Sequence, residues 1–318
     1  MTTMTHDAPV SQAPGSRMGA GLAFAVVSAF SFGMSGTIAK GLLAEGWSPA
    51  AAVTARILVA AAVLLVPGLI ALRGRWSLLR RNARVIVAYG VVAVAGCQFA
   101  YFSAVEYLQV GVALLIEYTA PVAVVCWLWL RHGHRPGAMT GAGGLVALVG
   151  LALVLDLLSG ASLHPLGVVW GLLAMVGVAT YFVLSAAEGN GLPPMVLAAG
   201  GMVTGAAALL LLAAVGLLDM GWSTDAATYG DSELPWWVAV LGLGVLSAAV
   251  SYTTGIAASR RLGSRLASFV ALLEVLFALA AAWVVLDEVP RPIQFVGGAL
   301  ILAGVVLVKL GERSTVRP

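Results

Sequence analysis

Ten apolar stretches of about 20 residues each follow one another along nearly the whole chain, separated by short polar joints. Hydrophobic residues make up 61% of the 318 residues and charged residues only 10%. Such a stretch is long enough to cross a bilayer as a helix, and inside lipid the backbone must satisfy its own hydrogen bonds. We therefore expect an all-α, polytopic membrane protein with ten transmembrane helices. The expected spans are 19–39, 48–72, 85–105, 109–130, 137–157, 166–187, 194–217, 236–257, 264–286 and 292–310.

Basic residues are distributed unevenly between the two sets of joints. If the N-terminus lies inside, 14 of the 17 lysines and arginines fall in inner segments, namely Arg17, Arg73, Arg75, Arg80, Arg81, Arg84, Arg131, Arg135, Arg260, Arg261, Arg265, Lys309, Arg313 and Arg317. Because cytoplasmic joints retain Lys and Arg, this predicts a bacterial-type inner (plasma) membrane protein with both termini in the cytoplasm. Residues 1–18, which lack a signal-peptide pattern, and 311–318 are expected to be cytoplasmic tails, the first disordered. The net charge of +3 requires no nucleic-acid partner.

The second half of the chain partly repeats the first. The matching positions are Glu117 and Glu274, Trp127 and Trp283, Arg135-Pro136 and Arg291-Pro292, and Gly143-Gly144 with Gly150 and Gly297-Gly298 with Gly304. Since each unit holds an odd number of helices, the second unit must enter the membrane from the opposite side. We expect two inverted five-helix repeats, 19–157 and 166–310, whose glycines allow close helix packing.

These features resemble those of EamA-type transporters of the drug/metabolite transporter superfamily. The resemblance rests on ten spans in two inverted repeats, with a Glu, a Trp and a Gly-Gly helix in each half. The segment from Ile116 to Pro121 resembles the fourth helix of the amino-acid and homoserine or threonine exporter branches. The family motif in the second repeat carries a proline after the glutamate, whereas Val275 follows Glu274 here. The resemblance implies a secondary transporter, commonly an exporter, with a central cavity; it does not fix the substrate.

Arg56 and Glu117 are expected at similar depth inside the membrane. Each lies about eight residues, or 12 Å, from the outer end of its span. A carboxylate at this depth usually faces a cavity or a partner and marks a substrate, ion or proton path. The two side chains could form a pair that binds substrate, or only a structural lock. Pro121 cannot donate to the carbonyl of Glu117, which either exposes a backbone acceptor to substrate or simply kinks the helix.

Glu274 is expected to lack a cation partner. The position that matches Arg56 in the second half falls near Met202, in a span without Lys or Arg. A carboxyl group without a partner in an apolar setting suits the uptake and release of a proton. Glu274 is therefore a candidate for coupling proton movement to transport, with a hydrogen-bonded structural acid as the alternative.

Other polar and aromatic side chains deep in the spans are candidates for the cavity lining. They are Ser31, Ser35, Gln98, Tyr101, Tyr118, Trp170, Tyr181, Ser251 and Tyr252. Trp47, Trp236 and Trp237 lie near span ends and are expected in the aromatic belt at the lipid interface. Cys97 and Cys126 are expected to be small core residues.

Several function classes are disfavoured. The chain has no phosphate-binding loop of an ATPase, and its histidines, His6, His132, His134 and His164, fall in tails or joints. We expect no enzyme, cofactor or metal site. The favoured function is a secondary transporter exporting a small polar metabolite such as an amino acid by alternating access, with proton coupling as a hypothesis. Multidrug efflux of hydrophobic or cationic compounds is the alternative, followed by an uncoupled channel or scramblase. The expected partners are a small-molecule substrate, protons and the lipid bilayer; the oligomeric state is left open.

Overall fold

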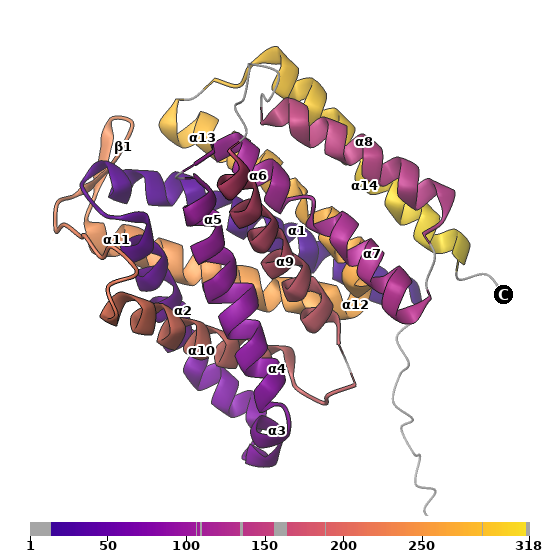
Figure 1. Cartoon of the computed structure of the whole chain (residues 1–318), viewed down its shortest axis with the longest axis horizontal. Helices are drawn as coiled ribbons and strands as arrows, with labels where there is room; N and C mark the ends of the chain where they lie inside the picture. The colour runs from indigo at the N-terminus through magenta and orange to yellow at the C-terminus, as the bar shows by residue number, and fades with distance from the viewer. Residues whose placement is uncertain are drawn as a thin grey trace, which may run out of the picture.

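The computed structural model describes residues 14–105, 107–108, 110–133, 136–155, 164–187, 189–287 and 289–315. Nearly all of them form helices that pack into one bundle (Figure 1). In chain order the elements are α1 (Pro14–Ala44), α2 (Pro49–Leu72), α3 (Trp76–Arg81), α4 (Ala83–Ala88), η1 (Tyr89–Gly96), α5 (Cys97–Val105), α6 (Val110–Glu117), α7 (Ala120–His132), α8 (Ala138–Val154), α9 (Pro165–Ala186), α10 (Pro194–Ala214), β1 (Ala227–Tyr229), β2 (Ser232–Leu234), α11 (Trp236–Leu241), η3 (Gly242–Val250), α12 (Ser251–Ala271), α13 (Leu273–Leu286) and α14 (Pro292–Thr315).

The expected helical membrane class is found. Within the described ranges, eight helical runs are long and apolar enough to cross a membrane, and α8 and α13 are shorter apolar helices. The expected spans 236–257 and 264–286 are divided differently, because α11, η3 and α12 continue through a kink at Gly263 and the chain then breaks at Leu272. Gly263 has a φ of 79°, a left-handed conformation that favours glycine. The arrangement of ten helices in two inverted repeats remains a prediction.

Among the residues that the structure describes, two kinds of irregularity are shared by the two halves of the chain. Wide π-helical turns form η1 and η3, and each continues directly into an α-helix. The second irregularity is a break with the same hydrogen bonds in both halves: Thr119 N–H donates to Ile116 and Val122 N–H to Thr119, as Leu272 donates to Phe269 and Val275 to Leu272. Such interruptions are frequent at functional sites, and all four lie next to the central cavity described below.

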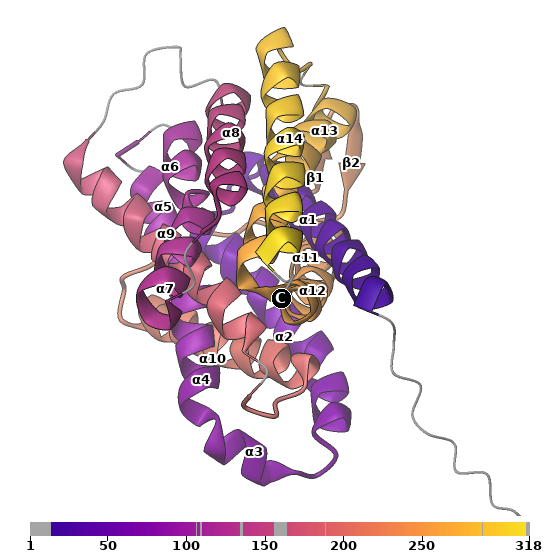
Figure 2. The ribbon, with the colours of Figure 1, turned by 90° about the vertical axis from the view of Figure 1, so that its right-hand side faces the viewer.

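The expected glycine packing is found between α8 and α14, which lie side by side in both views (Figures 1 and 2). A methyl group added to Gly143 would lie 2.8 Å from the carbonyl oxygen of Gly304, and one on Gly150 would lie 2.5 Å from that of Gly297. The reverse contacts, from Gly297 to Gly150 and from Gly304 to Gly143, are both 2.6 Å. The two backbones therefore touch reciprocally, and larger side chains cannot be placed between them.

The segment between α10 and α11 contains a short β-hairpin that packs against α1, which the sequence did not suggest. Its strands β1 and β2 pair as a short antiparallel hairpin. The hydroxyl of Tyr229 in β1 donates to Ile38 of α1 over 2.7 Å. Trp47 is buried against Trp236, and its indole N–H donates to Ser223 over 2.8 Å. Trp47 is therefore part of a packed joint and not of an exposed lipid-facing belt.

Candidate functional site

A cavity of about 560 Å³ lies inside the bundle and is lined by helices from both halves of the chain. Eight of the ten residues expected to carry the site line it: Arg56, Gln98, Tyr101, Glu117, Tyr118, Tyr181, Tyr252 and Glu274. Of the other polar candidates, Ser35 also lines it. The rest of the wall consists largely of Ala, Gly, Val and Leu side chains. A few polar groups in a mostly apolar cavity are typical of small-molecule sites.

Four expected residues lie outside the lining. Trp170 packs edge to face against Phe99, with ring centres 5.6 Å apart. Pro121 is buried in the first turn of α7. Ser31 and Ser251 are buried in the helix packing. Pro121 thus influences the site only by interrupting the helix beside Glu117.

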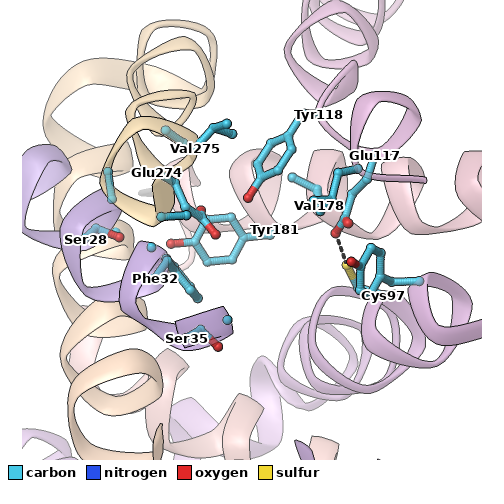
Figure 3. A pocket seen from close by; sticks show the side chains of 18 of the residues that line it. Ser28, Phe32, Ser35, Cys97, Glu117, Tyr118, Val178, Tyr181, Glu274 and Val275 are labelled. Carbon is cyan, nitrogen blue, oxygen red and sulfur yellow. Dashed lines mark hydrogen bonds between the residues drawn. The ribbon is translucent and has the colours of Figure 1, made fainter. Parts of the chain in front are cut away.

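Glu117 ends α6, immediately before the break between α6 and α7. Its Oε1 accepts a hydrogen bond from the Sγ of Cys97 over 3.4 Å (Figure 3). Pro121 has no N–H for the carbonyl of Glu117, and Val122 N–H turns back to Thr119. The expected interruption beside Glu117 is therefore present. Because α6 ends here, Glu117 lies at the negative end of that helix dipole.

Arg56 is buried in α2, but its surroundings differ from the expected pair. Its Nη2 donates to the backbone carbonyl of Ser247 in η3, and its guanidinium carbon lies 5.7 Å from the ring centre of Phe32. Among the described residues its Nε has no hydrogen-bond partner, and no ion pair joins it to Glu117. The expected Arg56–Glu117 pair is not formed. Counting along helices predicts the depth of a residue but not the direction in which its side chain points.

Glu274 lies in the first turn of α13, across the cavity from Glu117 (Figure 3). The hydroxyl of Tyr118 points toward it, and the two side chains interact. Arg56 also attracts Glu274 electrostatically, although the described residues contain no ion pair between them. Glu274 thus has the cation interaction that the sequence analysis gave to Glu117. Its position near the start of a helix favours negative charge as well.

The two carboxylates are not equivalent with respect to the breaks. In the shared hydrogen-bond pattern, Thr119 corresponds to Leu272. Glu117 precedes the first of these residues by two positions, and Glu274 follows the second by two. In the register of the breaks Glu274 matches Pro121 and Glu117 matches Val270, whereas the sequence repeat pairs Glu117 with Glu274.

Aromatic rings form one wall of the cavity. Tyr252 lies 5.0 Å from Phe32 and 5.4 Å from Tyr181 between ring centres, both in edge-to-face contacts. Tyr89 is fully buried behind them, 5.9 Å from Tyr181. The rings restrict the width of the cavity beside Arg56.

Six polar or aromatic residues of the cavity wall were not expected from the sequence: Ser28, Phe32, Cys97, Phe182, Ser268 and Gln294. Cys97 is buried, as expected, but it also contacts Glu117 and lines the cavity. The expectation of a core position for Cys126 is wrong, because that side chain is exposed. Phe32 and Ser28 face the cavity from α1. Cys97 lies four residues before Tyr101, on the same helical face, so helical spacing from a recognised candidate could have found it. The described residues contain no cluster of three His, Cys, Asp or Glu side chains that could hold a metal ion.

Comparisons with known proteins give a family. The model of the EamA-like transporter family matches residues 19–156 and again 165–310. The threonine/homoserine exporter RhtA of Escherichia coli strain K12 is 26% identical over 253 residues, which cover 78% of each chain. An uncharacterized transporter of Archaeoglobus fulgidus is 28% identical over 207 residues, covering 65% of this chain and 70% of the relative.

One solved structure has a similar fold. A crystal structure that is 21% identical in sequence superposes with a TM-score of 0.75, over 95% of this chain and 99% of that chain. The two matches to the family model together cover most of the chain, including every residue of the cavity wall. This integral membrane protein therefore belongs to the EamA-like transporter family.

Proposed function

We propose that the protein is a secondary transporter that exports a small zwitterionic metabolite, with an amino acid as the first expectation. The observation that carries this proposal is the central cavity, where one guanidinium and two carboxyl groups from both halves of the chain surround about 560 Å³. The similarity to an exporter of threonine and homoserine supports an amino acid as substrate.

The charges of the cavity complement a zwitterion. Arg56 has a buried Nε without a partner among the described residues, so a substrate carboxylate can accept hydrogen bonds from its guanidinium. Glu274 and the hydroxyl of Tyr118 offer oxygens to the substrate ammonium group. Because Arg56 and Glu274 attract each other without an ion pair, a substrate can enter between them and use both charges.

We assign the coupling proton to Glu117. Its described neighbours include the thiol of Cys97 but no cation at ion-pair distance, and it lies at the negative end of α6. An intramembrane carboxyl group of this kind is typical of proton paths. This assignment replaces Glu274, which the sequence analysis favoured, because Arg56 acts on Glu274.

Alternating access between two inverted repeats is the proposed mechanism, with both termini in the cytoplasm. The reciprocal glycine contacts of α8 and α14 and the paired chain breaks support two related halves. In such transporters one unit rocks against the other around a central site. The breaks beside Glu117 and Glu274 would let the site change shape while the α8–α14 contact stays closed.

The test is export by cells that lack their own amino-acid exporters. Cells that express the chain are challenged with toxic amino-acid analogues and, separately, with lipophilic cations. We expect resistance to the amino-acid analogues, and loss of it in Arg56→Gln. Resistance restricted to lipophilic cations would reject the zwitterion and support multidrug efflux, for which the apolar wall is also suited.

A further inference from the structure

A second groove lies on the outer surface of the bundle, between α2, α4 and α10. It has a volume of about 310 Å³ and is lined almost entirely by aliphatic side chains, including Leu65, Leu69, Val87 and Val203. These four side chains are 43–48% exposed. None of the lining residues belongs to the central cavity. The groove therefore opens toward lipid and not toward the transport site.

Arginines surround one end of this groove. Leu72, Leu79 and Ala83 line it, and each is followed directly in the chain by an exposed arginine: Arg73, Arg80 and Arg84. Arg75 and Arg81 are exposed in the same segment. In both views this segment, with α3, forms one end of the bundle (Figures 1 and 2). The sequence contains no acidic residue between Glu45 and Glu106, so the segment does not neutralise its own charge.

An aliphatic groove with arginines at one end favours one kind of ligand. A free phosphate would use the arginines but not the groove, and a zwitterionic lipid would use the groove with little gain from the arginines. A second copy in the same membrane orientation is disfavoured by charge. Its exposed acids, such as Glu233 and Asp287, gather around the hairpin, at the opposite end of α2 from these arginines.

We propose that this groove binds an anionic phospholipid. The acyl chain lies along the aliphatic walls of α2, α4 and α10, and the phosphate accepts hydrogen bonds from Arg80 and Arg84. Basic pockets at the ends of transmembrane helices bind anionic head groups in this way. The site is independent of the proposed substrate and of proton coupling.

The experiment measures lipid binding to the full chain by native mass spectrometry. Delipidated protein in detergent is titrated with dioleoyl phosphatidylglycerol and with dioleoyl phosphatidylcholine. We expect tighter binding of phosphatidylglycerol, weakened about thirtyfold in Arg80→Gln/Arg84→Gln. The control Arg131→Gln/Arg313→Gln removes the same charge elsewhere and should bind like the parent.

A second variant tests the groove without changing charge. Val87→Trp fills the groove and should also weaken phosphatidylglycerol binding, whereas Leu211→Trp, at a position 65% exposed on α10 outside the lining, should not. Equal affinity for the two lipids, or unchanged binding in the arginine pair, would overturn the proposal. Displacement of the lipid by equimolar glycerol 3-phosphate would also overturn it, because the head group alone would then account for binding. Loss of a dimer in Val87→Trp, with lipid binding unchanged, would do so as well.

Discussion

The α8–α14 contact and the central cavity use the two halves of the chain in opposite ways. In the contact the halves are interchangeable: Gly143 approaches Gly304 as its match Gly297 approaches Gly150, at 2.8 and 2.6 Å. In the cavity they are not, because Glu117 ends a helix beside Cys97 while Glu274 begins one opposite Arg56. A related pair of units thus forms a symmetric scaffold around an asymmetric site. In the proposed function, this asymmetry corresponds to separate tasks for the two carboxylates.

The largest effect is expected for Arg56→Gln, because the site contains one guanidinium for the substrate carboxylate. Loss of a buried charged partner costs about 2 kcal/mol or more, so transport should fall at least thirtyfold. The measurement is initial rate of uptake into proteoliposomes, with Arg56→Lys as a control that keeps the charge but not the fork of donors. A variant with unchanged rate would remove Arg56 from the substrate site.

Substitutions in the symmetric contact should weaken folding equally on both sides. Gly150→Leu and Gly304→Leu, at matching positions of the two halves, each force two backbones apart and should lower stability by about 1–3 kcal/mol or more. Thermal unfolding in detergent measures this. Gly141→Leu, at a glycine with open space around it, should behave like the parent. If only one member of the pair mattered, the symmetry of the contact would be refuted.

Glu274→Gln tests whether Glu274, and not Glu117, binds the substrate. The substitution removes the negative charge of Glu274, so the substrate ammonium group loses one partner. KM should rise about tenfold, which corresponds to one charge-assisted hydrogen bond. The effect should vanish for a substrate analogue that lacks the amino group. Equal losses for both compounds would instead point to a structural role of Glu274.

The smallest effect is expected for Cys97→Ala. A thiol is a weak donor, so removing its contact with Glu117 should change the rate by about twofold and leave KM unchanged. Cys126→Ala, at the exposed cysteine outside the cavity, is the control. A loss as large as that of Arg56→Gln would mean that Cys97 contacts the substrate.

Much of this organisation follows from the sequence. Apolar run length predicted the helical membrane class, and most of the intramembrane polar residues selected from the sequence lie in the cavity wall. The Gly143/Gly150 and Gly297/Gly304 pairs predicted a close helix contact. What the sequence could not provide was direction around each helix axis. Two π-helical segments and two breaks interrupt the regular helical turn, and such interruptions change the direction of the side chains that follow them, Glu274 among them. The charge of Arg56 acts on Glu274, although its depth suggested Glu117.

Other features depend on long-range packing. The β1–β2 hairpin is only three residues per strand, too short for a pattern of alternating hydrophobicity. Trp47 was expected in lipid because of its place near a helix end, yet the hairpin joint, distant in sequence, buries it. The second break has Glu274 where the first has Pro121, yet the chain breaks with the same hydrogen bonds. A local sequence motif is therefore not the only determinant of these breaks.

The division of labour between the carboxylates is tested most directly by comparing Glu117→Gln and Glu274→Gln in proteoliposomes. Two quantities are measured for each: uphill accumulation of substrate driven by a pH gradient, and substrate exchange without a gradient. We predict that Glu117→Gln retains exchange but loses gradient-driven accumulation, and that Glu274→Gln keeps its response to the gradient with weaker substrate affinity. The reverse result, with coupling lost only in Glu274→Gln, would contradict the assignment of the proton to Glu117.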